Sequence, residues 1–294
     1  MTTFVQLLAT GLMVGSIYGL VALGFVLIYK SSKIFNLAQG EFLMVGSFVA
    51  WTFLSLFKLP IWAGIILTFV VLGGVGYGLE RFPLRRMIGQ SHLSMIMVTL
   101  GIAILLRGLA TLAWAKPAAI GSMAYPKFLP TGTVTIFGAP YSELLIWSFV
   151  IIIVLVLMFA FFFRFTRSGL NMRATAEDQQ VAQSMGIKVT GVIAQTWAIA
   201  AIVSAVGGIL LGYHRGIDFG LTNLGLRAIA AALFGGLESI PGALIGGICI
   251  GVFESLAGGY IGHGFKEVAP YVAMALILIL KPFGLMGLQR IERV

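Results

Sequence analysis

Charged residues are scarce in this chain. Asp, Glu, Lys and Arg together make up 10% of its 294 residues, whereas soluble domains carry about 25% charged residues. Hydrophobic residues make up 59%, and the mean hydropathy is strongly positive. This composition excludes an ordinary soluble domain and indicates that lipid is the solvent for most of the chain.

Residues that bind metals or attack substrates are also few. The single cysteine, Cys249, excludes an internal disulfide, and His92, His214 and His263 lie far apart at the edges of apolar runs. The sequence has no Walker A motif, no HExxH zinc motif and no serine nucleophile elbow. We therefore expect no catalytic residue, no metal and no directly bound cofactor. An intramembrane enzyme would need Asp, His or Ser side chains to converge from distant helices.

Long apolar runs are abundant, and a helix needs about 20 such residues to cross a bilayer. Four runs lack any charged residue: Phe4–Tyr29, Ile61–Leu79, Leu144–Phe163 and Val189–Gly212. Two more carry one charge each, Ile34–Phe57 and Leu93–Ala115, and shorter runs follow at 223–237, 240–253 and 268–280. We predict an all-α integral membrane protein with eight or nine transmembrane helices in a single domain, 1–294. Region 223–259 forms either two short helices or a re-entrant hairpin.

The basic residues are unevenly distributed between the two sides of these runs. If the N-terminus lies outside, twelve Lys and Arg residues fall in inner loops and five in outer loops. Because positive residues beside transmembrane helices favour the cytoplasm, we expect an outer N-terminus and a cytoplasmic C-terminus.

One polar cluster, NLAQGEF, stands at the start of an apolar run. Asn36 is expected to cap a helix, Gly40 to allow close packing, and Glu41 to lie near the helix N-terminus, where negative charge is favoured. Ionisable groups in membranes are usually functional, so Asn36, Gln39, Gly40 and Glu41 are candidates for a translocation path or gate. A purely structural role for Glu41 remains an equal alternative, and Arg107 is expected to snorkel or to form a structural pair.

The inner loop at about 164–188 is the most informative polar segment. We predict a short amphipathic helix over Arg173–Met185, with Ala174, Val181, Ala182 and Met185 on one face and Gly186 as its C-cap. A solvated connector is the alternative. Since buried carboxylates are too few for proton coupling, the chain is either a channel or a permease driven by a separate ATPase.

Glycines recur at helical spacing. Gly11, Gly15 and Gly19 fall four apart, Gly74 and Gly78 repeat the interval, and several more lie between 242 and 251. Such spacing favours close helix packing in lipid. The outer loop from Lys116 to Pro140 contains four prolines and is expected to form an ordered cap or a short strand pair.

Three separated segments resemble one known family. They are GSIYGLVALGFVLIYKSSKIFNLAQGEFLMVGSF, RATAEDQQVAQSMGI and GGLESIPGALIGG, in this order along the chain. They look like the permease of the high-affinity branched-chain amino acid importers, the LivH type. Ala182 and Gly186 match the alanine and glycine of the cytoplasmic signature of ATP-binding-cassette (ABC) permeases, although Gln180 and Val181 replace its leading residues.

The resemblance implies an ABC importer permease fold and several partners. These are a second, LivM-like permease, two cytoplasmic ATPases (LivG-like and LivF-like) that hydrolyse the ATP, and a periplasmic substrate-binding protein, in a bacterial inner membrane. The implied ATPase-coupling residues are Arg173, Ala176, Glu177, Asp178, Ala182 and Gly186. The expected solutes are leucine, isoleucine and valine, and relatives that carry urea, short amides or small organic acids keep those alternatives open. An ATP-independent channel for a small solute is the rival from another class, and nucleic acid is not expected as a partner.

Overall fold

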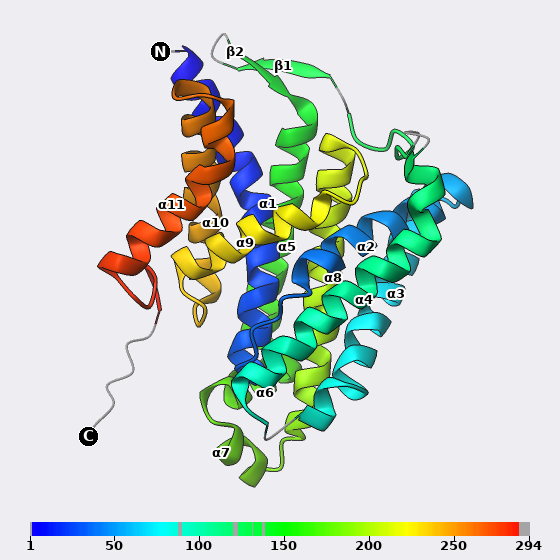
Figure 1. The fold of residues 1–294 in the computed structure, drawn as a ribbon, viewed down its shortest axis with the longest axis vertical. Coiled ribbons are helices and arrows are strands. Elements are labelled where there is room, and N and C mark those ends of the chain that lie inside the picture. The colour runs from blue at the N-terminus through cyan, green and yellow to red at the C-terminus, as the bar shows by residue number, and fades with distance from the viewer. Residues whose placement is uncertain (1, 88–89, 120–122, 131, 137–138, 288–294) are drawn as a thin grey trace. The chain divides into compact units, whose positions relative to one another are not determined.

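The computed structural model describes residues 2–87, 90–119, 123–130, 132–136 and 139–287. These residues form helices and one β-hairpin (Figure 1). In chain order the elements are α1 (Thr2–Ser32), α2 (Gln39–Trp51), the π-helical turn η1 (Thr52–Leu56), α3 (Ile61–Arg81), the 3-10 turn η2 (Leu84–Met87), α4 (His92–Ala119), β1 (Thr133–Ile136), β2 (Ala139–Ser142), α5 (Glu143–Phe165), α6 (Arg167–Glu177), α7 (Gln179–Ser184), α8 (Val189–Arg215), α9 (Leu221–Gly235), α10 (Ile240–Tyr260) and α11 (His263–Leu280).

Six helices in the described residues are long and apolar enough to cross a membrane: α1, α3, α4, α5, α8 and α10. The estimate of eight or nine spans also counted the segments that form α2, α9 and α11, which are helical but do not meet the same criteria of length and composition. Region 223–259 forms two helices, α9 and α10, and the segment predicted to be an outer loop leads into the expected strand pair, with Thr133 opposite Ser142. The prediction of an all-α membrane protein is therefore confirmed.

The chain separates into two compact units. The first comprises residues 1–26, 129–152 and 226–294, and the second comprises 27–128 and 153–225. The boundaries at 26, 152 and 225 fall inside α1, α5 and α9. Each unit therefore consists of segments that are distant in sequence, and the predicted single transmembrane domain stays a prediction.

In the first unit, glycines bring the backbones of α1 and α10 together. A Cβ atom added at Gly11 would lie 2.7 Å from the Cα of Val252, and one at Gly15 would lie 2.9 Å from the Cα of Ile248. From the other side, Gly247 and Gly251 face the backbone of α1. The predicted close packing is confirmed here, because only residues without a side chain permit this approach.

In the second unit, α8 packs against both α2 and α3. A Cβ atom on Gly46 of α2 would lie 2.5 Å from the Cα of Ala205, and one on Gly208 of α8 would overlap the carbonyl oxygen of Leu43. On α3 the contact to α8 is made at Gly76, whereas nothing in the described chain lies within 4 Å of a Cβ at Gly74 or Gly78. The prediction that Gly74 and Gly78 mark a packed face was therefore wrong within this chain.

Replacement of Gly208 by alanine is expected to destabilise the protein by about 1–3 kcal/mol, because α2 and α8 must separate to admit the methyl group. Gly74→Ala is the matched control, since it adds the same methyl group to an exposed position with open space. Stability is measured by heating each variant in detergent and determining how much of the protein stays monodisperse. Equal behaviour of the two variants would contradict the packing described here.

Candidate functional site

The polar cluster at the start of α2 lies in the second unit. Asn36 is buried, and its Oδ1 accepts a hydrogen bond from the backbone N–H of Ala38 at 3.0 Å. The helix begins only at Gln39, and no side chain caps it. The prediction that Asn36 caps α2 was therefore wrong. Its side chain closes a local turn before the helix, a competing use of Asn that the sequence did not distinguish from a cap.

Gln39 links α2 to α8. Its side chain is fully buried and accepts a hydrogen bond from Asn36 Nδ2 at 3.0 Å. Its own amide nitrogen donates to the carbonyl oxygen of Ala200 at 3.2 Å and to Ser204 Oγ at 2.7 Å. Because a buried amide that loses such partners is costly, Gln39 fixes the position of α2 on α8.

The next two residues contact the first turn of α9. A Cβ on Gly40 would lie 2.8 Å from the carbonyl oxygen of Thr222, which confirms that Gly40 allows close packing. Glu41 lies in the first turn of α2, as expected, and is 4% exposed. Its Oε2 accepts a hydrogen bond from Thr222 Oγ1 at 3.1 Å. Arg107 of α4 is exposed and lies close enough to act on Glu41 electrostatically. All four candidate residues are thus buried, but they form two groups: Asn36 and Gln39 are joined by a hydrogen bond and Gln39 binds α8, whereas Gly40 and Glu41 contact Thr222 of α9.

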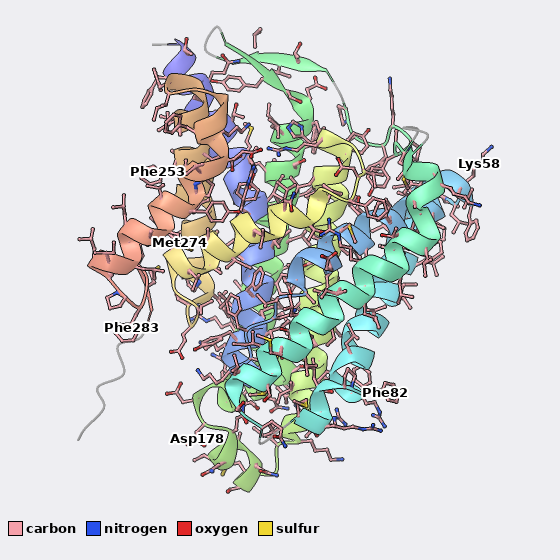
Figure 2. All side chains as sticks on the ribbon, viewed as in Figure 1. Lys58, Phe82, Asp178, Phe253, Met274 and Phe283 are labelled. Atoms are coloured by element: carbon pink, nitrogen blue, oxygen red, sulfur yellow. The ribbon has the colours of Figure 1, made fainter. Side chains whose placement is uncertain are left out.

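The predicted helix over Arg173–Met185 consists of two helices. α6 ends at Glu177 and α7 begins at Gln179, with Asp178 extended between them (φ −150°, ψ 117°). Figure 2 labels Asp178. Asp178 Oδ1 accepts hydrogen bonds from the backbone N–H groups of Gln180 at 2.7 Å and Val181 at 3.0 Å. The single helix was wrong because Asp178 caps a new helix instead of continuing the first one.

The break changes which residues face outward. Ala182 is 3% exposed, whereas the side chains of Val181 and Met185 are 59% and 79% exposed. The predicted common face of Ala174, Val181, Ala182 and Met185 does not exist, because Ala174 belongs to α6 and Ala182 is buried while Val181 and Met185 are exposed. Gly186 has φ +84°, so the predicted glycine C-cap is confirmed. Of the remaining candidates, Arg173, Glu177 and Asp178 are exposed and Ala176 is half-buried.

Two hydrogen bonds connect α6 and α7 to the membrane helices of the second unit. Gln179 Nε2 donates to the carbonyl oxygen of Ser31, near the end of α1, at 2.8 Å. Ser168 Oγ donates to Gln195 Oε1 of α8, also at 2.8 Å. Sequence reasoning missed both links, because the partners are 148 and 27 residues apart and nothing in the sequence pattern pairs them.

A buried ion pair forms in the first unit. Arg227 Nη1 of α9 lies 2.6 Å from Glu254 Oε1 of α10 and donates to Tyr18 Oη of α1 at 3.2 Å. Glu254 is 1% exposed. The sequence places Arg227 and Glu254 as single charges of opposite sign in otherwise apolar segments, a pattern that could have indicated this ion pair. Their pairing was not predicted from the sequence. Through its contacts with Glu254 and Tyr18, Arg227 joins α9 to both α10 and α1.

Comparison with known proteins gives full-length matches. Residues 7–281 match the sequence model of a protein family described as "Branched-chain amino acid transport system / permease component". The permease protein BraD of Pseudomonas aeruginosa is 32% identical, and LivH of Salmonella typhimurium is 30% identical, each over 99% of this chain and 98% of the relative; both are named high-affinity branched-chain amino acid transport system permease proteins. A probable LivH of Methanocaldococcus jannaschii is 31% identical over 91% of this chain and 88% of that protein.

Proposed function

Because the chain belongs to the family of permease components of branched-chain amino acid transport systems, we propose that it is the membrane-spanning subunit of an ATP-driven importer for leucine, isoleucine and valine. The observation that carries this proposal is the match to named permeases over almost the whole length of both chains. The six long apolar helices found in the described residues agree with a multi-pass membrane protein.

The α6–α7 segment is proposed to dock on an ATPase subunit. Val181 and Met185 present apolar side chains outward from a segment rich in polar residues, which suits burial in the groove of a partner. Within the second unit, Gln179 and Ser168 connect this segment to α1 and α8. Gln39 of α2 is in turn hydrogen-bonded to α8. A displacement of α7 when the ATPases close would therefore move α2, which carries Glu41. The solute would then reach Glu41 from one side of the membrane and afterwards from the other.

The proposed assembly contains the partners that the resemblance implies. A second permease completes the pathway, two cytoplasmic ATPases hydrolyse ATP, and a periplasmic binding protein delivers the amino acid. The chain itself is proposed to bind no cofactor. The asymmetry of the basic residues supports an inner-membrane orientation with the N-terminus outside and α6–α7 in the cytoplasm.

Reconstitution tests this function. The chain is placed in proteoliposomes with and without its ATPase, permease and binding-protein partners, and transport of labelled leucine and urea is measured. We expect ATP-dependent leucine transport by the complete assembly and none by the chain alone. Transport by the chain alone, without ATP, would establish a channel and overturn the proposal. Transport of urea but not leucine by the complete assembly would overturn the choice of solute.

The Glu41→Gln variant tests whether Glu41 lines the translocation path. The amide oxygen of glutamine still accepts the hydrogen bond from Thr222 Oγ1, so assembly and thermal stability are expected to stay unchanged. Removal of the charge is expected to lower leucine transport at least about threefold, since membrane carboxylates are usually functional. Glu143→Gln, at the start of α5 in the other unit, is the control. Full transport by Glu41→Gln would assign Glu41 a structural role only.

A further inference from the structure

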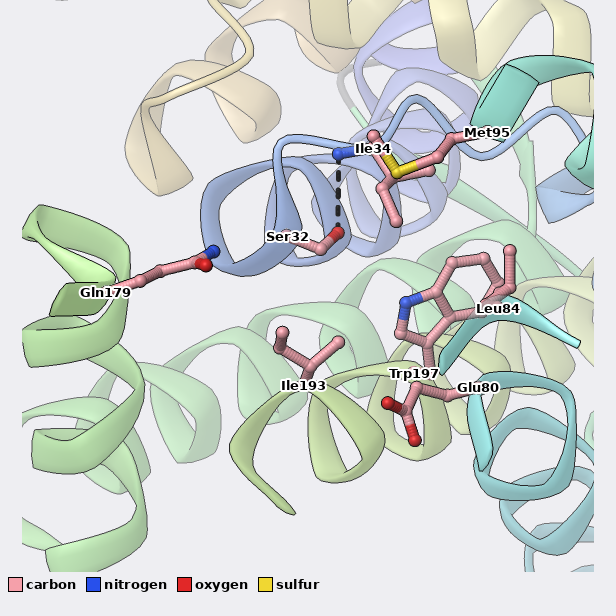
Figure 3. A pocket seen from close by; sticks show the side chains of 8 residues that line it. All are labelled: Ser32, Ile34, Glu80, Leu84, Met95, Gln179, Ile193 and Trp197. Carbon is pink, nitrogen blue, oxygen red and sulfur yellow. Dashed lines mark hydrogen bonds between the residues drawn. The ribbon is translucent and has the colours of Figure 1, made fainter. Parts of the chain in front are cut away.

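A pocket of about 130 Å³ lies in the second unit, beside α7 (Figure 3). Its apolar wall is formed by Ile34, Leu84, Met95 and Ile193, all of which are buried. For comparison, an apolar cavity of about 150 Å³ accommodates benzene. The pocket is therefore large enough for a branched aliphatic side chain, and it is distinct from the polar site around Glu41.

The indole of Trp197 supplies a hydrogen-bond donor that the protein leaves unused. Trp197 is fully buried, and its Nε1–H makes no hydrogen bond with any described residue. Figure 3 shows this nitrogen directed into the space between Ser32 and Ile193. Buried donors are nearly always paired in folded proteins, so this one indicates a bound acceptor. Ser32, Glu80 and Gln179 also line the pocket, but each already makes a hydrogen bond to another part of the protein.

A buried carboxylate that is paired with an arginine also lines this pocket. Glu80 lines it and is 1% exposed, and Arg85 Nη2 and Nε donate to its two carboxylate oxygens at 2.7 and 3.3 Å. The Arg85 side chain is 30% exposed. A buried carboxylate at the edge of an apolar pocket can accept hydrogen bonds from an ammonium group, and the Trp197 N–H can donate one to a carboxylate, so the pocket offers one partner for each charged group of an amino acid.

We infer that this pocket is a binding site for an α-amino acid with a branched aliphatic side chain. The aliphatic part fills the space among Ile34, Leu84 and Ile193, the carboxylate accepts the Trp197 N–H, and the ammonium is held at Glu80. The inference rests on the proposed function for the identity of the amino acid and for the cytoplasmic position of α7.

Because the pocket lies beside α7, binding in it would affect the position of α7. Gln179 of α7 lines it, and the same side chain is hydrogen-bonded to Ser31. An amino acid in the pocket would therefore hold α7 against the end of α1 in one arrangement, and a ligand that favours one arrangement opposes the change to another. The transported amino acid, once it has accumulated in the cytoplasm, would slow its own import.

The first test measures binding. The complete importer in lipid nanodiscs, without binding protein and without ATP, is titrated with labelled leucine. Saturable binding is expected, and Trp197→Phe should weaken it at least about tenfold, since a hydrogen bond to a charged acceptor is lost. Trp62→Phe is the matched control, because Trp62 is 70% exposed on α3. Ile193→Phe, which fills the pocket and leaves Trp197 intact, should also weaken binding. Absence of leucine binding, or equal binding by wild type and both pocket variants, would overturn the inference.

The second test measures control of the importer. Binding protein and leucine are enclosed in proteoliposomes with the ATPases facing outward, and ATP hydrolysis is followed while unlabelled leucine is added outside. External leucine is expected to slow the wild type and the Trp62→Phe variant, and to leave Trp197→Phe at least about tenfold less sensitive. If external leucine slows wild type and Trp197→Phe equally, the pocket inference fails while the proposed function stands. If enclosed leucine never stimulates ATP hydrolysis, the proposed function itself fails.

Discussion

Replacement of Arg227 by methionine is expected to destabilise the protein by about 3–5 kcal/mol, because it leaves the carboxylate of Glu254 buried without its cation. The two groups are 2.6 Å apart, and Glu254 is 1% exposed, so water does not replace the lost partner. Glu254→Leu should also destabilise the protein, because the Arg227 guanidinium then keeps, among the described carboxylates, only that of Glu267, whose side chain lies 4.0 Å away and is 80% exposed. The measurement is the loss of monodisperse protein in detergent on heating.

The double variant Arg227→Met with Glu254→Leu shows whether the single variants lose stability because a charge is left buried or because the side chains change shape. It removes both charges, so it is expected to recover more than half of the stability that either single variant loses. Glu267→Gln is the internal control, because Glu267 lies 4.0 Å from the same guanidinium with a side chain that is 80% exposed. Its replacement should have no measurable effect. If the two single effects simply add in the double variant, Arg227 and Glu254 are not coupled.

Replacement of both Val181 and Met185 by aspartate is expected to weaken ATPase binding at least about tenfold and to abolish transport, while the permease remains folded. Both side chains are more than half exposed, so the substitutions disturb no internal packing, whereas exposed apolar side chains that become buried on association often dominate the binding energy. Co-purification of the ATPase subunits with the permease and ATP-dependent leucine transport are measured together.

Gln183→Asp is the control for this pair, because it adds a negative charge to an exposed position of the same short helix. It should retain most of the ATPase binding. The structure also explains why Ala182 is a poorer choice for the test: it is 3% exposed, so a bulky residue there would disrupt α7 itself. Undiminished co-purification of the ATPases with the double aspartate variant would exclude α7 as their docking segment.

Local patterns in the sequence predicted several features well. The glycine spacing on α1 corresponds to a packed face because α10 supplies small residues at the matching height. The same spacing on α3 does not, since Gly74 and Gly78 face no described residue and Gly76 makes the contact to α8. Spacing shows which residues share a helix face, but only the partner helix decides which face is packed.

The sequence by itself determined that the protein is helical and lies in a membrane, because long uncharged apolar runs have no other stable environment. It also located the polar segments at 36–41 and 164–188, and the C-cap at Gly186. The tertiary structure decided how the polar groups pair: Gln39 with Ser204, Glu41 with Thr222, and Arg227 with Glu254. Hydrogen bonds and ion pairs act over about 3 Å. Residues that are far apart in the sequence come within this distance only after the helices have packed, so the sequence pattern alone does not show which of them pair.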